Sequence, residues 1–258
     1  MDDTLAVPTP GPDLPLFLAR RHRALAVGAR VRWHFPAGPD PDPGSGSGPG
    51  GGLLAADPAR LRAVVEGGGF AVDDVRVRPD GTTVHAIRLR TLPDFVGAGL
   101  RLLVVGLNPS EYAADAGVGF ARPGNRFWPA ALAAGIVTTD RDPLAAVTDH
   151  GTGMTDLVKR ATRTAAEVTV EEFRAGGVRL AALVGWLAPQ VVCVAGITGW
   201  RHAVDRRAVV GPQATPLGGR PVYVMPNPSG LNTHDTVTSL AAHLRAAVDL
   251  RFGEPVSR

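Results

Sequence analysis

The second half of the chain alternates short apolar runs with longer amphipathic segments. Apolar runs of strand length lie at residues 100–105, 191–195 and 221–225, with a shorter one at 155–158. Segments with helical spacing lie at residues 126–134, 170–186 and 236–252, the last with Thr233 placed to cap it. Apolar strands that alternate with helices are typical of a parallel sheet covered on both faces. We therefore predict, for residues 98–258, a three-layer αβα domain with a mostly parallel central sheet.

The first 97 residues follow a different pattern. Helices are expected at residues 16–25 and 58–67, the second capped by Asp57, and strands at residues 29–35, 72–78 and 82–89. Residues 36–52 are rich in Pro, Gly, Ser and Asp, a composition that cannot bury apolar surface and that predicts a mobile loop. We expect residues 1–97 to form a small α+β N-terminal extension.

The order helix, strand, helix, strand, strand in this extension resembles the tail of a Rossmann-type methyltransferase. No glycine-rich nucleotide loop precedes these elements. We therefore expect no cofactor site in residues 1–97 and interpret them as a structural or accessory remnant.

Composition narrows the class of protein. The one cysteine, Cys193, lies in an apolar run and is expected in the core. A single thiol excludes disulfide frameworks, cysteine-rich zinc sites and cysteine-ligated iron–sulfur clusters. The seven histidines show no metal-ligand spacing, and no apolar run approaches the roughly 20 residues of a membrane span. These observations predict a reduced, cytoplasmic protein without a bound metal.

The formal net charge of +3 is carried mostly by arginine, since Lys159 is the one lysine. A basic surface suits a nucleic-acid partner because it neutralises phosphates. Arginine enrichment is also what a GC-rich genome produces, so charge alone leaves the partner open. Lys159, Arg160 and Arg163 form a basic cluster after Asp156 that either contacts phosphate or forms a solvated face.

Two Asn-Pro turns follow predicted strands. Residues 106–110 read Gly-Leu-Asn-Pro-Ser, and residues 227–232 read Asn-Pro-Ser-Gly-Leu-Asn. In an open α/β sheet, loops that leave the carboxyl ends of parallel strands line one crevice, where ligands bind. Proline stiffens each turn and glycine allows a close approach of the backbone. The two turns are therefore expected to face each other across a pocket suited to a small polar ring.

Together with residues 119–128, Gly-Phe-Ala-Arg-Pro-Gly-Asn-Arg-Phe-Trp, these turns resemble the motifs of the mismatch-specific uracil-DNA glycosylases. That family lies within the uracil/thymine-DNA glycosylase superfamily, and the resemblance covers roughly residues 98–250. It implies a monofunctional enzyme that flips uracil out of double-stranded DNA, preferably from a G·U mismatch, and hydrolyses its N-glycosidic bond to leave an abasic site. It also implies no cofactor, and by analogy we expect a monomer.

The resemblance assigns roles to residues of the first two motifs. Asn108 is the catalytic residue, which holds the attacking water but cannot accept a proton at neutral pH, so we expect a slow enzyme. Phe120 stacks on the flipped base, and backbone amides near Leu107, Ser110 and Phe120 hold the uracil carbonyls. Phe127 and Trp128 are expected in the core, while Asn125 and Arg126 begin a helix or support the pocket from behind. Arg126 either contacts phosphate or forms a structural ion pair.

The third motif supplies the contact with the duplex. Leu231 is the wedge that fills the space left by the flipped base. The resemblance implies that backbone groups at Gly230 and Asn232 form hydrogen bonds with the guanine that is left unpaired when uracil flips out. Asn227 fixes the loop or contacts phosphate.

Departures from the family pattern leave alternatives open. Ser110 stands where well-known members carry Gly, and Ala113 stands where Ser is often found, with Tyr112 nearby. Asp156 stands where relatives carry Lys, which changes the local charge. A shifted substrate, such as hypoxanthine, xanthine or ethenocytosine, is therefore a second hypothesis. A non-catalytic DNA-binding module that kept the wedge is a third.

Overall fold

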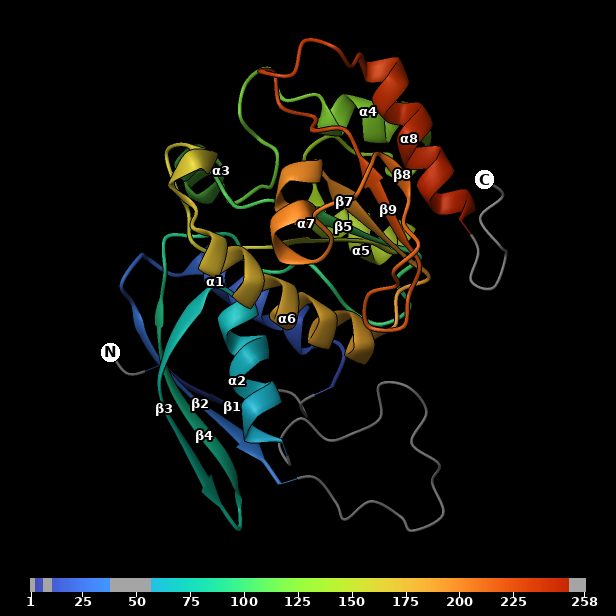
Figure 1. The fold of residues 1–258 in the computed structure, drawn as a ribbon. Helices are drawn as coiled ribbons and strands as arrows, with labels where there is room; N and C mark the ends of the chain where they lie inside the picture. The colour runs from blue at the N-terminus through green and yellow to red at the C-terminus, as the bar shows by residue number, and fades with distance from the viewer. Residues whose placement is uncertain (1–2, 7–10, 38–56, 251–258) are drawn as a thin grey trace.

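The computed structural model describes residues 3–6, 11–37 and 57–250 (Figure 1). The larger of two sheets has the strand order β6-β5-β7-β9-β8. Its four parallel strands are β5 (Leu102–Gly106), β6 (Thr152–Asp156), β7 (Val191–Ala195) and β9 (Val222–Met225), and the short β8 (Gly211–Pro212) runs antiparallel to β9. The prediction of a mostly parallel central sheet is confirmed.

Helices flank this sheet and explain why β5 and β7 are apolar along their whole length. All five residues of β5 and of β7 are buried, as expected for strands covered on both faces. α8 (Val237–Asp249) contacts β7 and β9 and packs against α4 (Phe127–Ala134), while α6 (Val170–Leu187) packs against α7 (Ile197–Ala203). The helices α3 (Glu111–Ala116) and α5 (Pro143–His150) also belong to the larger unit.

The N-terminal region forms a sheet of its own, with the order β1-β2-β4-β3. Its strands are β1 (Asp3–Ala6), β2 (Arg30–Pro36), β3 (Phe70–Arg78) and β4 (Gly81–Arg88), accompanied by α1 (Leu14–Ala24) and α2 (Pro58–Gly67). Alternate residues Val31, Trp33 and Phe35 of β2 are buried, and Trp33 meets Phe70 edge-on at 4.8 Å. The two helices and three strands expected here are present in the expected order, and β1, which precedes them, was not predicted. The resemblance to a methyltransferase tail stays a prediction.

A buried ionic network joins the two sheets. Asp94, in the segment that connects them, accepts hydrogen bonds from Lys159 (2.7 Å), Arg179 (2.9 Å) and Thr155 (2.6 Å). Its backbone N–H donates to the Gly67 carbonyl at the end of α2 (2.8 Å). Burial alone would raise the pKa of Asp94, but the two cations hold it below its usual value. The N-terminal sheet is thereby tied to the end of β6.

Some local predictions were wrong in detail. The strand expected at residues 155–158 begins earlier, at Thr152, because residues 152–156 pair in register with β5. The cap of the last helix is Thr236, whose hydroxyl accepts from the Ser239 N–H, and not Thr233. Asp57 caps α2 as predicted, through the Arg60 N–H. Most of the loop predicted at residues 36–52 lies outside the described residues. None of the described helices is long and apolar enough to span a membrane.

Candidate active site

The carboxyl ends of β5, β6, β7 and β9 meet at one edge of the larger sheet and open into a cavity of about 480 Å³. The predicted residues that line it are Leu107, Asn108, Ser110, Phe120, Asn227, Leu231 and Asn232. Gly230 is not among its lining residues. Sequence segments more than a hundred residues apart are therefore brought together, as the topology of a parallel sheet requires.

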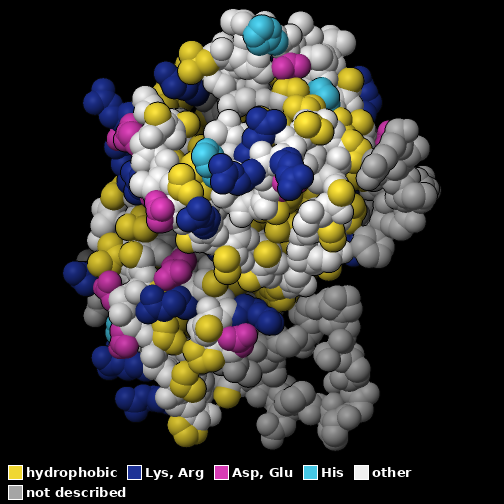
Figure 2. Space-filling model, viewed as in Figure 1, with side chains coloured by type: hydrophobic (Ala, Val, Ile, Leu, Met, Phe, Trp, Pro, Cys, Tyr) yellow, Lys and Arg dark blue, Asp and Glu magenta, His cyan; other side chains and the backbone are white. Residues whose placement is uncertain are grey.

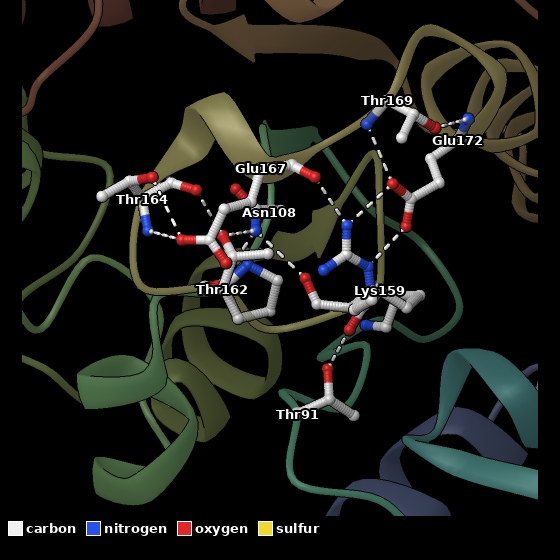
Figure 3. Close-up of polar contacts among 10 residues, drawn as sticks. Thr91, Asn108, Lys159, Thr162, Thr164, Glu167, Thr169 and Glu172 are labelled. Atoms are coloured by element: carbon white, nitrogen blue, oxygen red, sulfur yellow. Dashed lines mark hydrogen bonds and ion pairs between the residues drawn. The ribbon is translucent and has the colours of Figure 1, made fainter.

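Asn108 is held through its amide nitrogen (Figure 3). Nδ2 donates to the carbonyl oxygens of Pro109 (3.2 Å) and Arg160 (3.0 Å) and to Thr162 Oγ1 (2.8 Å). Carbonyls can only accept, which fixes Nδ2 on this side of the amide. The Thr162 hydroxyl then donates its own proton to the Thr164 carbonyl (2.8 Å). Among the described residues, no donor bonds Asn108 Oδ1, so that oxygen can accept from a molecule in the cavity.

The segment behind Asn108 is itself braced. Arg160 forms a forked ion pair with Glu172 (2.6 and 2.9 Å), which lowers the pKa of Glu172 to about 2. Glu172 also accepts from the Thr169 N–H, and Thr169 caps α6 in return (Figure 3). Lys159 forms an ion pair with Asp94, and Arg160 forms one with Glu172. Of the predicted basic cluster, Arg163 is therefore the residue that is exposed and has no ion pair with another described residue.

Ser110 lines the cavity and also stabilises the local structure. Its Oγ accepts from the Ala113 N–H (3.1 Å) and caps α3. The hydroxyl that departs from the family pattern is therefore occupied as an acceptor. Ala113 is buried and lines the cavity, whereas Tyr112 is exposed and is not a lining residue.

Phe120 occupies a strained backbone position. Its φ of 59° lies in the left-handed region, which a bulky side chain rarely adopts. The ring stacks on Phe127 at 4.2 Å, and Trp128 Nε1 donates to the preceding Gly119 carbonyl (2.8 Å). Phe127 and Trp128 are fully buried, as predicted. The core side chains thus hold one face of the Phe120 ring and leave it presented at the cavity wall.

The third motif is a loop built on Arg126. The Arg126 guanidinium donates to the carbonyls of Ser229 (2.9 Å), Asn232 and Asp235, and the Arg126 N–H donates to the Pro228 carbonyl (2.9 Å). Arg126 therefore supports the loop from inside and is not placed to touch phosphate. Gly230 is required by this packing, since a Cβ there would lie 2.9 Å from the Gly124 carbonyl oxygen.

At the tip of this loop Leu231 is 86% exposed, which excludes a core role for it. Asn232 is fully engaged within the loop, because its N–H donates to the Ser229 carbonyl and its side chain bonds Asn227, His234 and Asp235. Asn227 Oδ1 accepts from the Ser229 N–H (2.9 Å). The loop is thus rigid at its base and apolar at its tip.

Asp156 lines the cavity, but the sequence motifs assigned no function to it. It ends β6 and pairs with Gly106, and a side chain on Gly106 would collide with its carboxylate. Burial raises the pKa of Asp156 to about 6, against the opposing effect of Lys159. Its position at the end of a predicted strand was the feature that could have pointed to the cavity. Its pairing with Gly106 cannot be read from the sequence.

The site can therefore stack an aromatic ring, orient a water molecule and accept a proton near neutral pH. Within the described parts of the chain, no cluster of three or more His, Cys, Asp or Glu side chains is arranged to hold a metal ion.

Comparison with known proteins gives the family. The family model described as the uracil DNA glycosylase superfamily matches residues 93–251, which is more than half of the chain. The chain belongs to the uracil DNA glycosylase superfamily. Its membership supports DNA glycosylase activity and DNA as the substrate. The N-terminal sheet lies outside the matched glycosylase region.

Among solved structures, this chain is similar to a candidate uracil DNA glycosylase from Methanosarcina acetivorans determined by solution NMR. The two chains are 19% identical, with a TM-score of 0.44, and the match covers 60% of this chain and 96% of the other.

Proposed function

We propose that this protein is a monofunctional DNA glycosylase that releases uracil from double-stranded DNA, preferentially from G·U mismatches. The observation that carries the proposal is the convergence of Asn108, Phe120, Asp156 and the exposed Leu231 on one cavity at the sheet edge. No single motif accounts for such a combination of stacking, hydrolytic and wedge groups around one opening.

In the proposed reaction, Phe120 stacks on the flipped uracil and backbone N–H groups of the turns hold its carbonyl oxygens. The bond between uracil N1 and the sugar C1′ breaks, and its electron pair leaves on N1. Asn108 Oδ1 orients the water whose oxygen bonds to C1′. The Asp156 carboxylate accepts the proton that this water loses, a task that Asn108 cannot perform.

The proposed preference for a guanine partner rests on the loop at residues 227–232. Leu231 enters the space left by uracil and replaces its stacking. Both backbone groups of Asn232 are already bonded within the protein, so the backbone groups of Gly230 carry the contact with guanine. This assigns opposite-base recognition to one residue of the predicted pair, with Asn232 and Asn227 as the supports.

The test is incubation with labelled duplexes that carry G·U, A·U or G·T, and with single-stranded uracil DNA, followed by alkaline cleavage of abasic sites. The expected result is scission at G·U above the others. The Asn108→Ala variant should lose base release while keeping most of its affinity for DNA. Binding of duplex without release of uracil from any of these substrates would sink the proposal and favour a non-catalytic DNA-binding module.

One observation makes a second class of substrate compatible with the cavity. An ionised Asp156 in the cavity wall can accept a hydrogen bond from a ring N–H that neighbours a carbonyl. Uracil, hypoxanthine and xanthine each have such an N–H, whereas ethenocytosine has none. Duplexes with hypoxanthine, xanthine and ethenocytosine should therefore be included in the same assay. Release of hypoxanthine or xanthine above uracil would establish the shifted specificity.

A further inference from the structure

A second hollow lies beside the candidate active site, between α6 and α7. It has a volume of about 560 Å³, and we call it the α6–α7 groove. Its lining residues are Val170, Arg174, Thr198, Arg201, His202 and Arg206. Three arginines and a histidine thus surround a space that has no acidic side chain in its lining.

The arginines of the groove are not neutralised by neighbours. Arg174, Arg201 and Arg206 are exposed, and none forms an ion pair with another described residue. The nearby acids do not pair with these arginines. Glu171, in the first turn of α6, forms no ion pair with a groove arginine. Glu172 is paired with Arg160, as described above, and Asp205 Oδ1 accepts from the Arg207 N–H (2.9 Å). The groove therefore carries an uncompensated positive charge that would attract an anion.

Two of the basic groups are held in place. The ring of His202 lies nearly parallel to that of Phe173, with centroids 5.3 Å apart and an interplanar angle of 11°. Arg201 Nε donates to the Ala208 carbonyl (2.9 Å), which leaves the terminal nitrogens of its guanidinium free to bind. A fixed histidine and a fixed arginine lose little conformational entropy when a ligand binds.

The groove continues the rim of the active site along two chain segments. Thr198 follows the cavity residue Ala195 by three positions, and Val170 follows the cavity residue Ala165 by five. Figure 2 shows Lys and Arg side chains gathered around a His in the middle of this face, over the position of α7 in Figure 1. A strand of DNA that enters the active site would meet this basic surface next.

We propose that the α6–α7 groove binds backbone phosphates of the duplex next to the flipped nucleotide. The proposal rests on the proposed function in that DNA is taken as the partner. Phosphate contacts of this kind position a protein on the duplex without reading sequence. The groove thereby adds affinity and orientation that the neutral wedge loop does not supply.

The experiment measures binding of undamaged duplex by fluorescence anisotropy over a series of KCl concentrations. The Arg174→Gln/Arg206→Gln variant is suitable because neither side chain has a hydrogen bond to another described residue. Each phosphate contact contributes about 0.9 to the slope of log affinity against log salt, so the slope should fall by about 1.8. By the same relation, the affinity near 0.1 M salt should fall by roughly 60-fold.

Two controls separate the groove from general charge and from misfolding. Arg20→Gln/Arg78→Gln removes the same charge from exposed positions on α1 and β3 and should bind like the wild type. Arg174→Lys/Arg206→Lys keeps the charge and should keep the slope. An unchanged slope in the glutamine variant, an equal fall in the Arg20/Arg78 variant, or an equal loss in the lysine variant would each overturn the proposal.

Because the duplex is undamaged, this assay does not depend on base release. A wild-type protein that binds through the groove but releases no uracil would contradict the proposed function alone. Release of uracil with no effect of the groove variant would contradict the groove alone.

Discussion

In the proposed reaction, Asp156 and Asn108 divide the activation of water between two residues of the cavity. Asn108 Oδ1 can orient a water molecule, but an amide takes up no proton at neutral pH. Asp156 can, since a pKa of about 6 leaves it mostly ionised at pH 7.5 and still basic enough to accept the proton. The pair makes base release dependent on pH in a way that Asn108 alone would not.

The rate of base release is therefore expected to rise with pH, to be half-maximal near pH 6, and to level off above about pH 7. Asp156→Asn should remove this dependence and lower the rate at pH 7.5 by about 100-fold, a typical contribution of a general base. Single-turnover rates on a G·U duplex between pH 4.5 and 8.5 measure both effects. The same pH dependence in the Asn variant would show that another group is responsible.

Leu231 gives a prediction that separates function from stability. Because its side chain is 86% exposed, Leu231→Ala should change the free energy of unfolding by less than about 0.5 kcal/mol. Base release from a duplex should fall by at least tenfold, since a wedge that replaces stacking is lost. Single-stranded uracil DNA needs no wedge and serves as the control. An equal loss on both substrates would argue against the wedge role.

At the scale of elements, the second and third motifs act as one unit joined by Arg126. Its guanidinium fork reaches three carbonyls of the loop that follows β9. An ammonium group cannot reproduce this planar fork. The position of Leu231 is therefore set from α4, more than a hundred residues away in sequence.

Arg126→Lys is accordingly expected to loosen the loop while α4 stays folded. We expect the free energy of unfolding to fall by about 2 kcal/mol, since hydrogen bonds that involve charged groups are lost. Amide hydrogen exchange should accelerate at residues 229–232 and remain unchanged in α4. Urea denaturation and exchange measured by mass spectrometry test the two effects. Unchanged exchange in the loop would show that Arg126 does not support it.

The sequence predicted the elements that have a clear apolar pattern and not those without one. β5, β7, β9, α6 and α8 have apolar patterns long enough to recognise. β8, α3 and α7 span only two to seven residues and have no such pattern. Thr233 and Thr236 are equally good caps by composition, and the choice depends on the Ser239 hydroxyl, which bonds back to the Thr236 N–H. The three motifs contain most of the residues that line the cavity. The place of Asp156 in the cavity depends on the register between β6 and β5, which the sequence does not show.

At the scale of the whole molecule, Asp94 couples the N-terminal sheet to the glycosylase region. Asp94→Asn would leave Lys159 and Arg179 without their buried counter-charge. The free energy of unfolding is expected to fall by about 3–5 kcal/mol at pH 7, the usual cost of breaking a buried ion pair. Urea denaturation of the two proteins measures this difference.

The pH dependence of that difference follows from the lowered pKa of Asp94. A carboxylate whose pKa is lower in the folded state stabilises the protein above its ordinary pKa of 3.8 and loses this effect as the pH falls through the folded value. The gap between wild type and Asp94→Asn should therefore narrow below about pH 4. A gap that stays constant down to pH 2.5 would show that the stabilisation does not come from charge.

The position of β5 has a consequence for the protein while it is being made. β5 is the first strand of the larger sheet to be synthesised, yet it lies between β6 and β7, which follow it by about 50 and 90 residues. Its hydrogen bonds must wait for both partners, and the loop that carries Leu231 is later still. A nascent chain therefore cannot assemble the cavity together with its wedge before residue 232 has left the ribosome.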